Sequence, residues 1–226
     1  MDYLSIRYFE KIMRNANAQY PRISPYRVMM RSAQKYVTPA QKEWIVEIGR
    51  TLDAYRMRVA GKSLTEIFES DIRGLKNNRL GDCGESSALS MGALFANGYT
   101  DGKIARLIFE GQARDLSTGK IVSKRNFDTT HECVVLNLAK NACSENPKSY
   151  GKNSIVMDAW EGFCSNISEA FKKYFDIFLS GTYKHIDKTN NVELSYKPRF
   201  YFYKHNEEFN EKTVEKFKKL FPDLII

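Results

Sequence analysis

Cys83 has the residue type and the surroundings of a catalytic nucleophile. It lies in the passage Leu80–Ser87, where the first turn of a predicted helix brings unpaired backbone N–H groups and the positive end of the helix dipole to its thiol. Both features stabilise a thiolate, so the sequence predicts a Cys83 pKa below the ordinary value of about 8.5. Gly81 and Gly84 on either side are interpreted as room for a substrate backbone. The alternative for Cys83 is a small buried core residue.

A histidine and a carboxylate follow at the ends of predicted strands. His131 begins the strand expected over residues 131–138, and such a rigid mount can aim an imidazole at a thiol. Asp158 ends the short apolar strand expected over residues 154–158. It could accept the second ring N–H of a histidine and fix its tautomer. Taken singly, His131 is also typical of a surface position, and Asp158 of an ordinary turn.

The order Cys83, His131, Asp158 is what a thiol acyl-transfer site requires. In the mechanism it implies, Cys83 attacks a carbonyl or carboxamide carbon, backbone N–H groups hold the oxyanion, and His131 protonates the leaving amine or ammonia. Water or an amine then resolves the thioester while Asp158 orients the imidazole. Three further residues are expected to line the substrate pocket: Asp82, Gly84 and Trp160.

These passages resemble the transglutaminase-like branch of the papain-like superfamily. In that branch a G-x-C helix start is followed by a loop and a strand, then by an H-x-x-V strand, then by a strand that ends in aspartate. The matching segments are Gly81-Asp82-Cys83, Asn97-Gly98-Tyr99 before Ile104-Ala105-Arg106, His131-Glu132-Cys133-Val134 and Val156-Met157-Asp158. They cover residues 78–160. The separations of 48 and 27 residues between successive triad members suit this compact core better than papain.

The resemblance implies an α+β, papain-like or transglutaminase-like fold, with a helical N-terminal part and a catalytic helix packed against an antiparallel sheet. It implies an enzyme that acts on proteins without a cofactor or metal: a glutamine deamidase or transglutaminase, or a cysteine protease, as among bacterial effectors. Ala159 departs from the pattern, because many relatives have proline there. No glutamine precedes Cys83 to donate to the oxyanion. The remaining donors are the backbone N–H of Cys83 and, as weaker side-chain candidates, Asn77, Asn78 and Gln112.

Length and composition bound these expectations. A chain of 226 residues, 42% hydrophobic and 13% aromatic, can bury a sizeable core, which excludes wholesale disorder. The longest apolar runs are strand-sized, so no membrane span is expected. The four cysteines form no C-x-x-C pair, and with three histidines they give no zinc-ligand spacing. This usage is typical of free thiols in a reducing compartment.

Helical patterns precede strand patterns along the chain, which favours the α+β class. Proline follows a capping residue at Ser24 and Thr38, and an apolar stripe spans Pro39–Ala60. Capping-box spacing links Thr38 to Gln41 and Ser63 to Glu66. A second stripe comprises Leu64, Ile67, Phe68 and Ile72. Further helices are expected after Asp82 with a stop at Asn97-Gly98, over residues 165–180 and over residues 210–220.

Strands are expected over residues 103–110, 120–124, 131–138, 154–158 and 199–204. On a period of two, His131 shares a strand face with Cys133 and Val135. The organisation predicted is one catalytic domain over residues 1–226. It comprises a helical N-terminal part over residues 1–76 and a helix-plus-sheet core with the triad over residues 77–226.

Competing interpretations remain open at this stage. The net charge of +8 arises from basic residues spread along the chain, which indicates a solvated cationic surface rather than a nucleic-acid-binding arm. A non-catalytic basic interaction module would have no reactive thiol at Cys83. An arylamine acetyltransferase uses the same triad with different glycine-rich flanks. The N-terminal sequence does not resemble a Sec signal, so the expected location is the cytoplasm, or a host cytosol reached without that signal.

Overall fold

The computed structural model describes residues 3–23, 43, 47, 64–99, 103–122, 131–170, 172, 185–187, 191–203 and 210–226. The chain divides into two compact units. The sheet unit comprises Met1–Arg7, Asp101–Met157 and Phe163–His205, and the helical unit comprises Tyr8–Thr100, Asp158–Gly162 and Asn206–Ile226. Helices and an antiparallel sheet confirm the predicted α+β class. The finer papain-like assignment stays a prediction.

Several expected features lie outside the described residues. These are the caps at Ser24, Thr38 and Ser63, nearly all of the stripe over residues 39–60, and most of the helix expected over residues 165–180. The strand expected over residues 120–124 is described only at its start, where Ile121 forms an isolated bridge with Arg114.

The sheet unit is built on six strands in the order β4-β3-β2-β1-β6-β5. Their bounds are β1 Ala105–Asp115, β2 His131–Leu136, β3 Ile155–Asp158, β4 Phe163–Asn166, β5 His185–Asp187 and β6 Val192–Tyr203. β1 pairs antiparallel with β2 and β6, β2 with β3, and β5 with β6. β2 and β3 begin and end within two residues of the strands predicted there.

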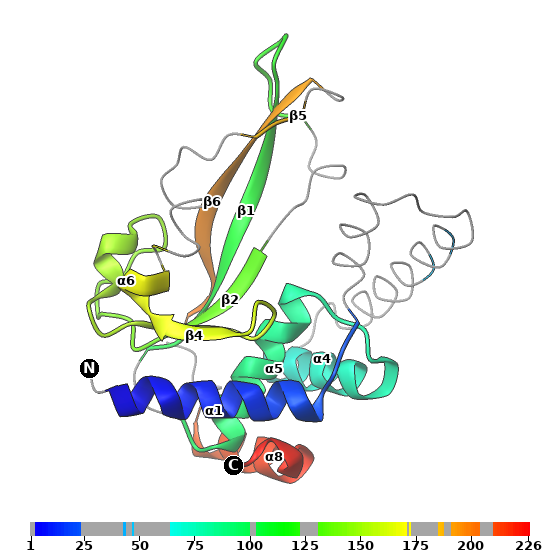
Figure 1. Ribbon diagram of the computed structural model, residues 1–226, viewed down its shortest axis with the longest axis vertical. Coiled ribbons are helices and arrows are strands. Elements are labelled where there is room, and N and C mark those ends of the chain that lie inside the picture. Colours follow the sequence, from blue (N-terminus) through cyan, green and yellow to red (C-terminus); the bar gives the residue numbers. More distant parts are fainter. Residues whose placement is uncertain are drawn as a thin grey trace. The chain divides into compact units, whose positions relative to one another are not determined.

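β1 and β6 are long neighbouring strands of this sheet, and they form the β1–β6 ribbon (Figure 1). The sequence predicts only part of each strand. The pairing runs from Ala105 opposite Tyr203 to Asp115 opposite Val192. Both strands extend well beyond the predicted ranges, because each satisfies the backbone N–H and C=O groups of the other over polar stretches such as residues 110–115. Local hydrophobic alternation cannot indicate such pairing.

One face of the sheet carries the core of this unit. Phe109, Cys133, Val135 and Val156 are buried in a cluster with Tyr150 and with residues of α6, Ile167–Ala170. Cys133 lies opposite Leu107 and His131 opposite Phe109 in the register. The shared face predicted for His131 and Cys133 is therefore confirmed.

The helix predicted from Ser165 begins two residues later. Ser165 and Asn166 belong to β4, and α6 starts at Ile167. The Asn166 side chain accepts a hydrogen bond from the Glu169 N–H at 2.9 Å, which makes Asn166 the N-cap. The backbone N–H of Ile167 donates to the carbonyl of Ser154. These hydrogen bonds fix the boundary between β4 and α6 at Ile167. The apolar pattern of the sequence alone predicts a helix start two residues earlier, at Ser165.

The described part of the helical unit comprises helices and a 3-10 turn that pack around a buried centre. The helices are labelled in Figure 1. These elements are α1 Tyr3–Gln19, of which residues from Tyr8 belong here, α4 Leu64–Asn78, α5 Cys83–Ala96, α8 Glu211–Leu220 and η4 Pro222–Leu224. The predicted helices after Asp82 and over residues 210–220 are confirmed. So is the stop at Asn97-Gly98, where Gly98 has φ +78°. Every residue of α5 from Glu85 to Ala96 is buried, so α5 is the central helix rather than an amphipathic surface helix.

Gly92 is the contact point of three helices in this unit. A Cβ at Gly92 of α5 would overlap the Cδ1 atom of Ile72 on α4 and lie 3.2 Å from the Phe217 ring on α8. We expect Gly92→Ala to lower the free energy of unfolding by about 1–2 kcal/mol, because overpacking outweighs the better helix propensity of alanine. Chemical denaturation measures this.

Removal of the overlapping atom provides the control for Gly92→Ala. Ile72→Val deletes Cδ1, so the double variant should be more stable than Gly92→Ala alone. A Gly92→Ala protein as stable as the wild type would contradict this prediction. It would mean that the three helices can move apart at Gly92 without lowering the free energy of unfolding.

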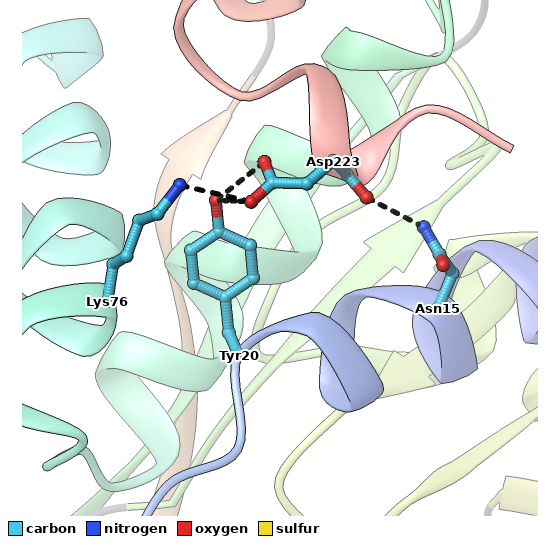
Figure 2. A network of polar contacts seen from close by, with 4 residues as sticks. All are labelled: Asn15, Tyr20, Lys76 and Asp223. Carbon is cyan, nitrogen blue, oxygen red and sulfur yellow. Dashed lines mark hydrogen bonds and ion pairs between the residues drawn. The ribbon is translucent and has the colours of Figure 1, made fainter.

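The C-terminal turn is fastened to α1 and α4 by Asp223 (Figure 2). The Tyr20 hydroxyl donates to the Asp223 carboxylate at 2.9 Å, and Lys76 Nζ lies 3.1 Å from Oδ2. The Asn15 amide donates to the Asp223 backbone carbonyl at 3.2 Å. Burial, and then the hydrogen bond and charge of Asp223, raise the pKa of Tyr20. The neutral phenol is therefore part of the folded structure.

We expect Tyr20→Phe to cost about 1–2 kcal/mol of unfolding free energy near neutral pH. Because the folded-state pKa of Tyr20 is raised, its contribution is fully present below the unfolded value of about 10 and is lost as pH rises above it. The loss of stability in alkali should therefore be smaller in Tyr20→Phe than in the wild type. Urea unfolding at pH 7 and above pH 10 measures both effects. Tyr8→Phe, at an exposed tyrosine of α1, should change neither.

Candidate functional site

Cys83 is the first residue of α5, as the sequence predicts, and its side chain is half-buried. The preceding residue, Asp82, is the N-cap, and its backbone N–H donates to the Glu85 carboxylate at 2.9 Å. This is a capping box, and the spacing Asp82-x-x-Glu85 is its signal in the sequence. The capping box gives α5 a defined start, and this fixes the direction of the Cα–Cβ bond of Cys83.

The approach to Cys83 is held by a second backbone segment. Ile23 forms a parallel bridge with Leu80, and Arg79 has the positive φ of 54° that lets the chain leave α4. The Ile23 N–H donates to the Arg79 carbonyl at 2.8 Å, and the Gly81 N–H donates to the Ile23 carbonyl at 3.2 Å. The loop between α4 and α5 is thus pinned on both sides of Leu80.

The interpretation of Gly81 as room for a substrate is wrong. Gly81 is buried, and a Cβ there would overlap the Cδ2 atom of Leu75 and lie 3.0 Å from the Glu85 Cβ. Because Gly81 has no side chain, Leu75 of α4 can pack closely against the start of α5. Gly84 is half-exposed, as is Asp82. Their place in a substrate pocket stays a prediction.

Asp158 is 1% exposed and opens a tight turn. Its Oδ1 atom accepts the backbone N–H groups of Trp160 at 3.1 Å and Glu161 at 2.9 Å. The Gly162 N–H donates to the Asp158 carbonyl at 2.7 Å. Asp158 is therefore a turn residue, as the alternative interpretation expected. A catalytic role would be a second role of the same side chain. Trp160, the other expected pocket residue, is half-buried beside it.

An arginine that the sequence analysis did not single out connects the Asp158 turn to the start of α5. Arg22 donates through Nε to the Ser86 hydroxyl at 2.8 Å and through Nη2 to the Ala159 carbonyl at 2.7 Å. Ser86 in turn donates to the Asp82 carbonyl at 2.6 Å. Within the helical unit, this network thus joins the Asp158 turn to Asp82, the residue that precedes Cys83.

His131 belongs to the sheet unit. It begins β2, as predicted, is 6% exposed, and stacks on the Phe109 ring with centroids 6.2 Å apart. The surface interpretation of His131 is therefore wrong. The next residue, Glu132, pairs with Arg106. The structure thus brings Cys83, Asp158, Asp82, Gly84 and Trp160 into the helical unit, and His131 into the other.

The other candidate oxyanion donors and thiols differ in exposure. Asn77 and Asn78, the weaker oxyanion candidates, are exposed at the end of α4, and the side chain of Gln112 lies outside what the structure describes. Cys133 is buried, Cys164 is half-buried and Cys143 is exposed. Cys83 is therefore one of three thiols that a reagent can reach, and exposure alone does not distinguish it.

Among the described residues, no group of three or more histidine, cysteine, aspartate or glutamate side chains is arranged to hold a metal ion. Within the same ranges no helix is long and apolar enough to cross a membrane. Comparison of the chain with family models, with curated proteins and with solved structures finds no match.

Proposed function

We propose that the chain is a thiol-dependent acyl-transfer enzyme with Cys83 as nucleophile, His131 as general acid and base, and Asp158 as the carboxylate that orients the imidazole. The observation that carries the proposal is the Arg22 network, which fixes the Cys83 helix start and the Asp158 turn in one unit. A helix start and a turn held in fixed geometry are what nucleophilic catalysis needs. The rigid, buried mount of His131 on β2 also supports it.

The reaction follows from these roles. His131 takes the proton of Cys83, and the thiolate adds to the carboxamide carbon of a glutamine side chain. The oxyanion is held by backbone N–H groups at the start of α5, including that of Cys83. His131 then protonates the departing nitrogen, so ammonia leaves and a thioester forms. Water, deprotonated by His131, cleaves the thioester to give glutamate and the free thiol. An amine in place of water gives transglutamination.

The substrate class rests on the resemblance to transglutaminase-like enzymes. It favours a protein glutamine over a scissile peptide bond, and it extends the proposal to a bacterial effector that modifies a host protein. Cleavage of a peptide bond by the same residues is the alternative outcome. Intact mass distinguishes them: deamidation adds about 1 Da, transglutamination replaces ammonia by the amine, and proteolysis gives two fragments.

Alkylation of Cys83 by iodoacetamide tests the proposal without a known substrate. In a protein carrying Cys143→Ser and Cys164→Ser, we expect the alkylation rate of Cys83 to rise with a midpoint below about pH 8.5. His131→Ala should move that midpoint upward, because the imidazolium that stabilises the thiolate is lost. Peptide mass spectrometry over a pH series measures the rate.

Exposed Cys143 supplies the matched control for this alkylation experiment. In a protein carrying Cys83→Ala, the alkylation rate of Cys143 should not respond to His131→Ala. An ordinary midpoint for Cys83, unchanged by His131→Ala, would contradict the proposed nucleophile. It would support the non-catalytic alternative.

A further inference from the structure

We propose that Arg22 is a positioning residue for this site, which acts by holding the Asp158 turn against the first turn of α5. The inference rests on the proposed function for its catalytic consequence, and on the contacts of the helical unit for its geometry. Arg22 follows α1 by three residues and belongs to no motif of the chain. Its role therefore comes entirely from what its guanidinium group binds.

The guanidinium group of Arg22 connects three separate segments. Nε donates to the Ser86 hydroxyl at 2.8 Å, Nη1 to the Asn17 carboxamide oxygen at 2.9 Å, and Nη2 to the Ala159 carbonyl at 2.7 Å. These acceptors lie on α5, on α1 and in the Asp158 turn. The planar fork of an arginine can serve three such acceptors at fixed angles, which a lysine ammonium cannot reproduce.

The Asp158 turn receives two donors at a single point. The Ala159 carbonyl accepts from Arg22 and also from the Asn17 amide at 3.0 Å. The residue before that carbonyl is Asp158, whose Oδ1 atom already holds the turn closed. Movement of the Ala159 peptide would therefore move the Asp158 carboxylate. Arg22 and Asn17 are the side chains that oppose this movement.

The hydrogen bonds of Arg22 to Ala159 and Ser86 form the Arg22 bridge, and its Ser86 end lies near the nucleophile in sequence. Ser86 accepts from Arg22 and donates to the Asp82 carbonyl at 2.6 Å, and Asp82 is bonded covalently to Cys83. Ser86 and Ala159 are both buried, so water competes little for these bonds. Loss of Arg22 would thus release the carboxylate from the nucleophile helix while the capping box keeps α5 intact. Misplacement of a catalytic group by about 1 Å can reduce a rate by about 100-fold.

The experiment compares Arg22→Met in two backgrounds. The readout is the iodoacetamide alkylation rate of Cys83 at pH 6, with Cys143→Ser and Cys164→Ser present throughout. Arg22→Met alone should lower this rate by about 10-fold, the effect of about one unit in the thiol pKa. In the Asp158→Asn background the same change should lower it by less than about 3-fold, because the carboxylate that Arg22 positions is already lost. The melting temperature should fall equally in both backgrounds.

Arg73→Met is the matched control. Arg73 is exposed on α4 and makes an i,i+4 ion pair with Glu69, so its loss should leave the Cys83 rate unchanged. An Arg22→Met effect of equal size in both backgrounds would identify a merely structural residue and overturn the positioning role. Rescue in Arg22→Lys to the wild-type rate would overturn the need for the fork.

Amide hydrogen exchange separates failure of this inference from failure of the proposed function. The N–H groups of Trp160 and Glu161 are bonded to Asp158, so Arg22→Met should accelerate their exchange by at least about 10-fold relative to Arg73→Met. Unchanged exchange overturns the role of Arg22 whatever the reactivity of Cys83. Accelerated exchange in a protein whose Cys83 titrates as an ordinary thiol supports the Arg22 bridge and contradicts only the enzyme.

Discussion

Cys83→Ala should lower turnover by more than about 10⁴-fold while the protein folds normally. The substitution removes only the thiol, which is the group that forms the thioester in the proposed mechanism. The cost in stability should stay below about 1 kcal/mol, since Cys83 is half-buried and alanine is a better helix former. The measurements are release of ammonia from an N-acylated glutaminylglycine peptide and from unfolded casein, with a thermal melt of each variant.

The other accessible cysteines provide the control for this prediction. Cys143→Ala and Cys164→Ala remove thiols that are also open to reagents, yet both should retain full turnover. Cys83→Ser should be inactive as well, because a hydroxyl beside an imidazole has a far higher pKa than a thiol. Undiminished turnover of Cys83→Ala would remove this residue from the mechanism. An equal loss of turnover in Cys143→Ala would instead assign the nucleophile to the exposed Cys143.

The start of α5 could be predicted because its signals are local. Cys83 follows a capping residue, the buried apolar side chains follow at helical spacing, and Asn97-Gly98 ends the helix with a positive φ at Gly98. Each signal involves residues a few positions apart, which is the range over which backbone hydrogen bonds in helices form. The start of β2 at His131 and the end of β3 at Asp158 were also predictable from local signals, since each residue bounds a short apolar run.

Features that depend on distant pairs could not be predicted in this way. Arg22 binds Ser86 and Ala159, which lie 64 and 137 positions away in the sequence. Any of the chain's many basic residues could have made such contacts, so composition and spacing carry no signal for this one. The overlap that Gly81 avoids with Leu75 is likewise visible only once α4 and α5 are packed. A glycine beside a cysteine indicates small size but not what occupies the space.

The length of the β1–β6 ribbon was hidden for a related reason. Residues 110–115 of β1 are mostly polar or small and resemble a loop, yet they pair with β6 up to Asp115. There Asp115 closes the turn by accepting hydrogen bonds from the hydroxyl and N–H groups of Ser117 and Thr118. The Ser117 hydroxyl first, and then the Thr118 N–H and hydroxyl, lower the pKa of Asp115 to about 2. Pairing with residues that lie 77–87 positions away in the sequence, from Asp115 opposite Val192 to Glu110 opposite Lys197, thus determined the structure where local propensity was weak.

Asp158→Asn is the substitution that decides whether the triad is complete. The asparagine carboxamide keeps an oxygen at the Oδ1 position, so it can still accept the N–H groups of Trp160 and Glu161. The turn and the fold should therefore survive. The charge that stabilises an imidazolium is lost, and an amide N–H directed at the imidazole would select the wrong tautomer. By analogy with serine triads, we expect turnover to fall by about 10²–10⁴-fold.

Asp158→Ala and Glu132→Gln make this test specific. Alanine removes the acceptor of both turn N–H groups from a residue that is 1% exposed, so Asp158→Ala should lose both turnover and stability, the latter by about 1–3 kcal/mol. Glu132 is the carboxylate adjacent to His131 in sequence, but its ion pair with Arg106 engages it on β1, so Glu132→Gln should retain turnover. If Asp158 only closes a turn, Asp158→Asn will change turnover by less than about 3-fold. Loss of turnover in Glu132→Gln with an unaffected Asp158→Asn would then transfer the orienting role to Glu132, and the Arg22 bridge would be a structural link alone.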